Sequence, residues 1–206
     1  MTEATAQAQH DGAERATSSF FAHAAAKADW SAIDHVGQKM AKALRNLLRA
    51  RGAELPEARY ASNGEGSFAD WAQARDGRDI LARLRFAPLK GSVGLAIPGA
   101  LVAQLVDIHY GGDGRTAEAK AELSTAERRY AERLIGELLV ALSAQWNDLQ
   151  PIDVSFIGFE HSPSRLRVAR SDENVFAQDW QVGAGNLTGA KISLVFLAEP
   201  MRKIGQ

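Results

Sequence analysis

Residues 124–151 read STAERRYAERLIGELLVALSAQWNDLQP. Ser124 followed three residues later by Glu127 is typical of a helix capping box, and Pro151 cannot continue a helix. The apolar residues between them recur every three to four positions, with one row at Tyr130, Leu134, Leu138, Leu142 and Trp146. This stretch therefore predicts a long amphipathic helix with a single apolar face.

A second long helix is predicted near the start of the chain. Ser31 followed by Asp34 resembles a capping start, Gly52 stands where a C-cap glycine would, and Pro56 ends the pattern. Its apolar positions are Trp30, Ile33, Val36, Met40, Leu44, Leu47 and Leu48. Two long helices that each carry one apolar face need a common surface to cover.

Shorter runs with strand character supply that surface. They are rich in β-branched and aromatic residues and are bounded by turn residues. They lie at residues 57–61, 80–86, 92–97, 152–159, 175–182 and 191–196. Short helices are expected at 67–75 and at 98–110, the latter with Pro98 at its first position. We expect an α/β fold with a mostly antiparallel sheet and one helix-covered face.

The order of these elements repeats within the chain. Residues 30–107 and 123–204 each run from a long helix through a strand, an irregular segment and two strands to a proline-marked stretch. A pseudo-twofold domain, with two long helices covering one sheet, is the economical interpretation. Residues 1–28 have few large apolar side chains and are expected to form a flexible arm, which leaves residues 29–206 as one domain.

Composition excludes several classes of protein. The 24 basic and 25 acidic side chains nearly cancel, so no global field favours nucleic acid. The absence of cysteine excludes disulfides, thiolate zinc sites and a cysteine nucleophile, and it suits a reducing compartment. Charged residues interrupt every long apolar stretch, and the N-terminus lacks the pattern of a secretion signal. A cytoplasmic protein that does not span a membrane is expected.

The most concentrated local motif is Tyr110-Gly111-Gly112-Asp113-Gly114-Arg115, which follows the predicted helix at 98–110 directly. Three glycines in four positions indicate positive φ angles or a close approach of another backbone. One interpretation is a helix C-cap followed by a tight turn. The other is a docking loop whose backbone is exposed to a partner.

Motifs for catalysis and for cofactors are not found. Gly112, Gly114 and Ala117 match G-x-G-x-x-A, but this loop leaves a helix whereas a dinucleotide loop leaves a strand. The histidines are scattered singly, and no G-x-S-x-G elbow occurs. We therefore expect no cofactor, no metal and no enzymatic activity, which leaves protein binding as the favoured function.

Three segments together resemble the middle domain of the flagellar motor switch protein FliM family. They are GSVGLAIPGALVAQLVDIHYGGDGR (91–115), ELSTAERRYAERLIGELLVALSAQWNDLQPIDVSFI (122–157) and GNLTGAKISLVFLAEPMRKI (185–204). The resemblance covers residues 31–204. It implies the CheC-like fold, a three-layer α/β/α sandwich with an internal duplication, which agrees with the repeated element order.

The resemblance also implies a function. Proteins of this family form the ring of the motor switch, the C-ring, at the cytoplasmic face of the inner membrane in the flagellar basal body. There they contact neighbouring copies and connect the rotor protein FliG to FliN, and they take part in chemotaxis and motility. The GGxG loop of the family faces FliG, which assigns that role to Gly111, Gly112, Asp113, Gly114 and Arg115.

Two departures from the family limit this transfer. Family members begin with an acidic and apolar segment that captures phosphorylated CheY, and residues 1–19 do not resemble it, so CheY binding stays uncertain. Members also continue into a FliN-like domain after the equivalent of residues 201–204, whereas this sequence ends at Gln206. A trimmed chain and a naturally short protein both fit, and FliN contact is expected only through such a further domain.

Two other functions remain open. CheC- and CheX-like phosphatases of phosphorylated CheY share the fold and carry Glu-x-x-Asn on a long helix, where both side chains orient a water. Here the corresponding residues are Glu137-Leu138-Leu139-Val140, without an amide, and the first long helix contains no Glu. A switch-like adaptor of a related secretion system is the other alternative. The GGxG loop favours the motor.

Overall fold

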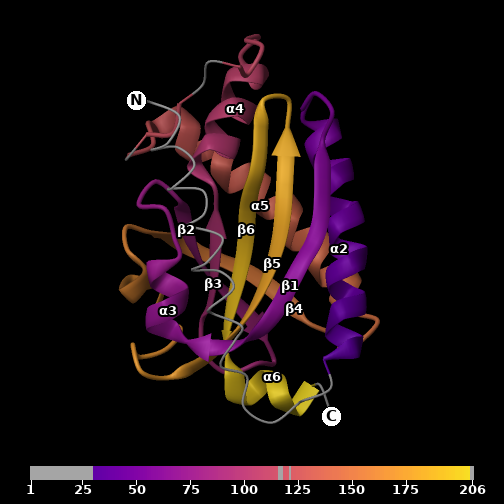
Figure 1. The fold of residues 1–206 in the computed structure, drawn as a ribbon, viewed down its shortest axis with the longest axis vertical. Coiled ribbons are helices and arrows are strands. Elements are labelled where there is room, and N and C mark those ends of the chain that lie inside the picture. Colours follow the sequence, from indigo (N-terminus) through magenta and orange to yellow (C-terminus); the bar gives the residue numbers. More distant parts are fainter. Residues whose placement is uncertain (1–29, 116–117, 121, 205–206) are drawn as a thin grey trace, which may run out of the picture.

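A computed structural model describes residues 30–115, 118–120 and 122–204 of the chain. Its centre is a six-stranded sheet in the order β1-β5-β6-β3-β2-β4, in which every neighbouring pair is antiparallel (Figure 1). The strands are β1 (Glu57–Ser67), β2 (Ile80–Ala87), β3 (Val93–Ile97), β4 (Asp153–Glu160), β5 (Asn174–Ala184) and β6 (Leu187–Leu197). The predicted antiparallel sheet is thus confirmed.

Helices lie on both faces of this sheet. The long ones are α2 (Ser31–Ala50) and α5 (Thr125–Trp146), and the short ones are α3 (Phe68–Gln73), α4 (Gly99–His109), α6 (Ala198–Ile204) and the 3-10 helix η1 (Pro163–Leu166). Side chains of α2 and α5 join one large core with the sheet. Phe68 and Trp71 of α3 and Leu166 of η1 form a second, smaller core on the other face. The three-layer arrangement that the family resemblance implies is therefore confirmed, with a thin third layer, whereas the expectation of only one helix-covered face was wrong.

The internal repeat is visible in the topology. The element order α2-β1-α3-β2-β3-α4 is followed by α5-β4-η1-β5-β6-α6. The two halves make β1 equivalent to β4, β2 to β5 and β3 to β6. Exchanging each strand for its equivalent gives the same sheet order, read from the opposite edge. The pseudo-twofold relation thus passes between β3 and β6, the central pair of the sheet.

The N-terminus of α5 follows the capping pattern in its sequence. The Ser124 hydroxyl accepts a hydrogen bond from the Glu127 backbone N–H at 3.3 Å, and the Glu127 carboxylate accepts one from the Ser124 N–H at 2.8 Å. Both bonds satisfy donors that the first turn of a helix leaves free. The row from Tyr130 to Trp146 is buried, as the periodicity predicts.

The start of α2 differs from the prediction. Trp30, and not Ser31, occupies the N-cap position, and it makes no side-chain cap hydrogen bond. The Asp34 carboxylate accepts instead from Asn63 Nδ2 at 2.6 Å, which joins α2 to β1. The Trp30 ring packs on Phe176, with centroids 4.5 Å apart, so packing onto the sheet sets where this helix begins.

Some element boundaries were predicted wrongly. β1 extends to Ser67 and not to residue 61, because Ser62–Ser67 pair with β5 despite their weak strand propensity. β6 begins at Leu187 and not at residue 191. Pro98 is the N-cap of α4 and not its first helical residue. The expected arm, residues 1–28, lies outside the described residues. None of the described helices is long and apolar enough to cross a membrane.

Candidate functional site

The glycine motif forms the loop that follows α4. Gly111 has a φ of +94° and donates its N–H to the Ile108 carbonyl at 3.0 Å, and the Gly112 N–H donates to the Asp107 carbonyl at 2.9 Å. These two bonds, with Tyr110 as C-cap, are those of a Schellman motif. The C-cap interpretation is therefore correct for Gly111, and these hydrogen bonds fix the end of α4.

Asp107 holds the rest of the loop in place. Its Oδ2 accepts a hydrogen bond from the Gly114 N–H at 2.9 Å. An added Cβ on Gly112 would lie 2.1 Å from the same oxygen, so only glycine lets this carboxylate pass. The loop is thus shaped from within by a side chain of the preceding helix.

The loop residues do not all face outward. Gly111, Gly112, Asp113 and Arg115 are exposed, and Asp113 Oδ1 accepts the Arg115 N–H at 3.0 Å. Gly114 is buried at a φ of +74°, where an added Cβ would lie 2.7 Å from Gln104 Cγ. Gly114 therefore anchors the loop, and its own surface is not available to a partner.

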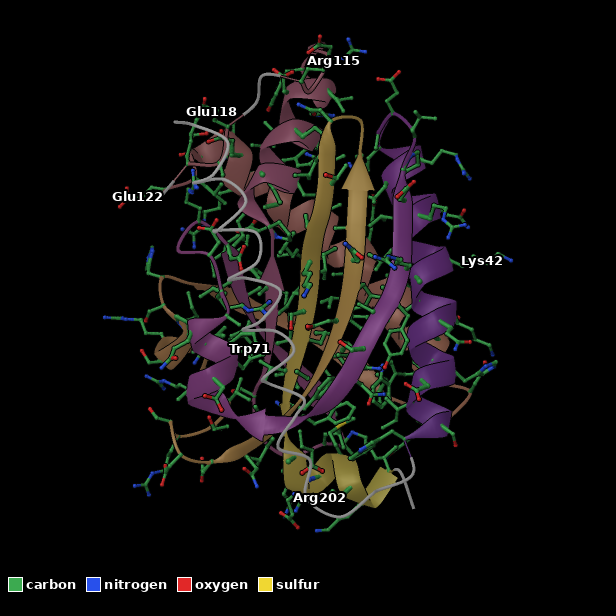
Figure 2. The ribbon with its side chains drawn as sticks, in the orientation of Figure 1. Lys42, Trp71, Arg115, Glu118, Glu122 and Arg202 are labelled. Atoms are coloured by element: carbon green, nitrogen blue, oxygen red, sulfur yellow. The ribbon has the colours of Figure 1, made fainter. Side chains whose placement is uncertain are left out.

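Two further segments meet this loop, one before β1 and one between β5 and β6. The Arg115 guanidinium lies 3.4 Å from the Glu54 carboxylate, and the Arg115 carbonyl accepts from Asn186 Nδ2 at 2.9 Å. The Gly185 N–H donates to the Glu54 carbonyl at 2.7 Å. Figure 1 shows these loops together at one end of the sheet, and Figure 2 places Arg115 there, far from Arg202 at the α6 end.

A buried polar side chain lies beneath two of these loops, the glycine loop and the loop between β5 and β6. Gln104 of α4 is only 4% exposed and donates from Nε2 to the Ala184 carbonyl at 2.9 Å. An added Cβ on Gly185 would lie 3.1 Å from that nitrogen. Sequence reasoning missed Gln104, although a lone amide on the apolar face of a short helix was a detectable signal.

The surface of the three loops combines weak charge with exposed apolar area. The Arg115–Glu54 pair is more than half exposed on both sides, so it contributes little to stability. Leu55 and Tyr110, both absent from the sequence-based site, are 80% and 67% exposed. Such a surface suits another protein better than a small charged ligand. Within the described ranges, no group of three or more acidic or histidine side chains is placed to hold a metal ion.

The helix positions that a phosphatase would use have other contacts. The Glu137 carboxylate is held by Arg51, whose Nε donates at 3.0 Å. The Arg51 guanidinium also lies 5.4 Å from the centre of the Tyr130 ring. Val140, three residues after Glu137, projects into solvent. This part of α5 thus offers a paired carboxylate and an apolar side chain, not a carboxylate beside an amide.

Sequence comparison places the chain among known proteins. The family of the flagellar motor switch protein FliM matches residues 26–204. FliM of Escherichia coli K12 is 29% identical over 126 residues, and FliM of Pseudomonas aeruginosa is 24% identical over 127 residues. Each alignment covers 59% of this chain and 38% of the relative, so the aligned part is well under half of those proteins.

Structural comparison finds the same fold in solved proteins. One chain of a FliG–FliM complex from Helicobacter pylori superposes with a TM-score of 0.79 at 14% identity, covering 87% of this chain and 100% of that chain. The FliM middle domain of Vibrio alginolyticus gives 0.71 at 19% identity, covering 84% and 99%. The fold is therefore that of FliM middle domains. Given the match across residues 26–204, the chain belongs to the flagellar motor switch protein FliM family.

Proposed function

We propose that this chain is a non-catalytic component of the flagellar motor switch that binds FliG through the loop Gly111–Arg115. One observation carries the proposal. Gly111 and Gly112 expose backbone without side chains on the outside of the loop, and hydrogen bonds to α4 hold the loop on its inside. A FliM-fold protein that was crystallised with FliG supports the choice of partner. This function assigns the chain to chemotaxis and motility.

The loop suits close docking for two physical reasons. Gly111 and Gly112 carry no side chain, so a partner's backbone can approach them directly. The hydrogen bond that the Asp107 carboxylate accepts and the Schellman motif order the loop in advance, which reduces the entropy lost when a partner binds. A flexible glycine loop without these bonds would bind more weakly.

The shape of the molecule supports a connecting role. The FliG-facing loop lies at one end of the sheet, and α6 lies at the other (Figure 1). Arg202 of α6 is tied to Glu65 of β1 by two hydrogen bonds, one of them 2.8 Å from Nε, so that end is firmly attached. We place FliG at the loop end and the remaining switch proteins toward α6.

The wider assignment follows from the same role. Neighbouring copies stand side by side in the C-ring, at the cytoplasmic face of the inner membrane in the basal body. Phosphatase action on phosphorylated CheY is the weaker alternative, because Glu137 is paired with Arg51 and Val140 replaces the amide.

Substitution of Gly111 tests the proposal. Gly111→Asn adds a side chain where nothing lies within 4 Å, and asparagine tolerates positive φ better than other side chains. We expect a native circular dichroism spectrum and a loss of about tenfold or more in FliG affinity by calorimetric titration.

Gly91→Asn is the matched control. Gly91 has a φ of +97°, and an added Cβ there would also meet nothing within 4 Å. Its turn lies away from the glycine loop, because the turn leads into β3, where Gly94 pairs with Val195 near the α6 end of the sheet. This variant should keep wild-type affinity. If the wild-type chain does not bind FliG, the proposed function is wrong. If Gly111→Asn binds like Gly91→Asn, the loop is not at the interface.

A further inference from the structure

We propose that Leu55, in the loop between α2 and β1, is an apolar anchor of the FliG-binding surface, which therefore extends beyond the glycine loop to include Leu55 and Tyr110. This inference rests on the proposed function, because FliG is the partner. Leu55 is distant in sequence from the glycine motif, so the motif alone would not place it on the binding surface.

The backbone of Leu55 is unfavourable for leucine. Its φ is +44°. Among the residues that the structure describes, Leu55 and Arg167 are the only ones other than glycine with a positive φ. Leu55 also precedes Pro56, which favours an extended conformation at the preceding residue. Glycine or asparagine would adopt this conformation at lower cost in free energy. Folding alone thus gives no reason for leucine here.

The side chain of Leu55 is also hardly buried by the folded chain. It is 80% exposed, the largest exposed fraction among the large hydrophobic residues that the structure describes as exposed. Val140 and Ile157, also exposed, lie on α5 and β4 and have ordinary backbone angles. Among the described residues, Leu55 alone combines a left-handed backbone with an exposed apolar side chain. Contact with a partner would cover that side chain.

Contacts hold the Leu55 loop against the glycine loop. Glu54, its neighbour in sequence, pairs with Arg115 through its carboxylate and accepts the Gly185 N–H through its carbonyl. Gly52 packs on α4, since an added Cβ there would lie 3.0 Å from Ile108 Cγ2. A protein that docks on the glycine loop therefore meets Leu55 on the adjoining loop.

The chemistry of this surface defines what the partner must supply. Leu55 and Tyr110 offer apolar area beside bare glycine backbone and an ion pair that is easily opened. The complementary surface of FliG would carry an apolar pocket for Leu55 next to polar groups for the loop. Burial of the leucine side chain in such a pocket removes apolar area from water, and tyrosine is among the residues that contribute most at interfaces.

Three variants test the inference by calorimetric titration with FliG. Leu55→Asn keeps the approximate size, suits the left-handed backbone and removes the apolar surface. We expect the Kd to rise about tenfold or more, while the melting temperature does not fall. Leu55→Met keeps the apolar area and should stay within about threefold of wild type. Val140→Asn, at a similarly exposed side chain on α5, should bind normally.

The outcomes separate this inference from the proposed function. If Gly111→Asn weakens binding but Leu55→Asn does not, the Leu55 anchor is wrong and the loop assignment stands. If Leu55→Asn leaves FliG binding intact but alters self-association in sedimentation velocity, Leu55 serves contacts between copies and the inference fails. If the wild-type chain does not bind FliG, both fail.

Discussion

Replacement of Gly37 by alanine tests how α2 packs on the sheet. Gly37 lies on the buried face of α2 against Tyr60 of β1, where an added Cβ would lie 2.4 Å from Cε2 and 2.6 Å from Cδ2 of the ring. The Gly37 carbonyl also accepts a hydrogen bond from Trp180 Nε1 at 2.8 Å. Glycine at this position thus allows helix and strand to approach closely.

Two opposing effects decide the sign of the change. Alanine favours a helix over glycine by about 1 kcal/mol. Forcing a methyl group into a filled site costs about 1–3 kcal/mol, and weakening the buried Trp180 bond adds about 1 kcal/mol more. The Tyr60 ring also contacts the Trp180 ring, with centroids 6.1 Å apart, so a shift of Tyr60 would disturb a second contact. We expect a net loss of about 1–3 kcal/mol in the free energy of unfolding.

Gly136→Ala in α5 is the matched control, since Gly136 is exposed and an added Cβ would meet nothing within 4 Å. It should stabilise the protein by about 0.5–1 kcal/mol. Thermal melts followed by circular dichroism compare the two, with a shift of about 2–4 °C per kcal/mol for a chain of this size. A Gly37→Ala variant that melts at or above wild type would refute the reasoning on close packing.

Three further predictions concern pH and the N-terminus. Hydrogen bonds from Lys120 and then Ser124 lower the pKa of Glu127 from 4.5 to about 2. Its stabilisation is complete above pH 4.5 and lost toward pH 2, so the melting-temperature advantage of wild type over Glu127→Gln should shrink across that range. Burial raises the pKa of Asp79 from 3.8 to about 6, so its charged form opposes folding. Asp79→Asn should therefore melt above wild type at pH 7, with the difference disappearing below pH 3.8; a constant difference would contradict this. Deletion of residues 1–16, which lack an apolar pattern, should leave the melting temperature nearly unchanged, and a loss of several degrees would assign them to the core.

Features with a local cause could be predicted from the sequence. The rows of apolar residues identified α2 and α5, because burial on one face of a helix imposes its period on the sequence. The capping box at Ser124 was predicted correctly for the same reason, since both partners lie within one turn. The second half of β1 was missed, because Ser62–Ser67 become a strand only by pairing with β5.

Within its six residues, the glycine loop combines a feature set by the local chain with features that depend on how side chains pack in the folded protein. The φ of Gly111 follows from the helix end just before it, so a C-cap glycine was predictable. The roles of Gly112 and Gly114 were not, because they depend on where the Asp107 carboxylate and the Gln104 side chain lie. Three similar glycines therefore have different functions, and Gly114 faces inward although the motif suggested an exposed residue.

The two long helices, the repeated order of elements, the antiparallel sheet and the position of the glycine loop could all be predicted from the sequence. These properties follow from side-chain periodicity and from neighbours in the chain. The meeting of Glu54, Arg115 and Asn186, and the exposure of Leu55 beside them, became visible only in the folded molecule. The physical reason is that contacts between distant segments depend on the order and register of the strands, which no single segment encodes.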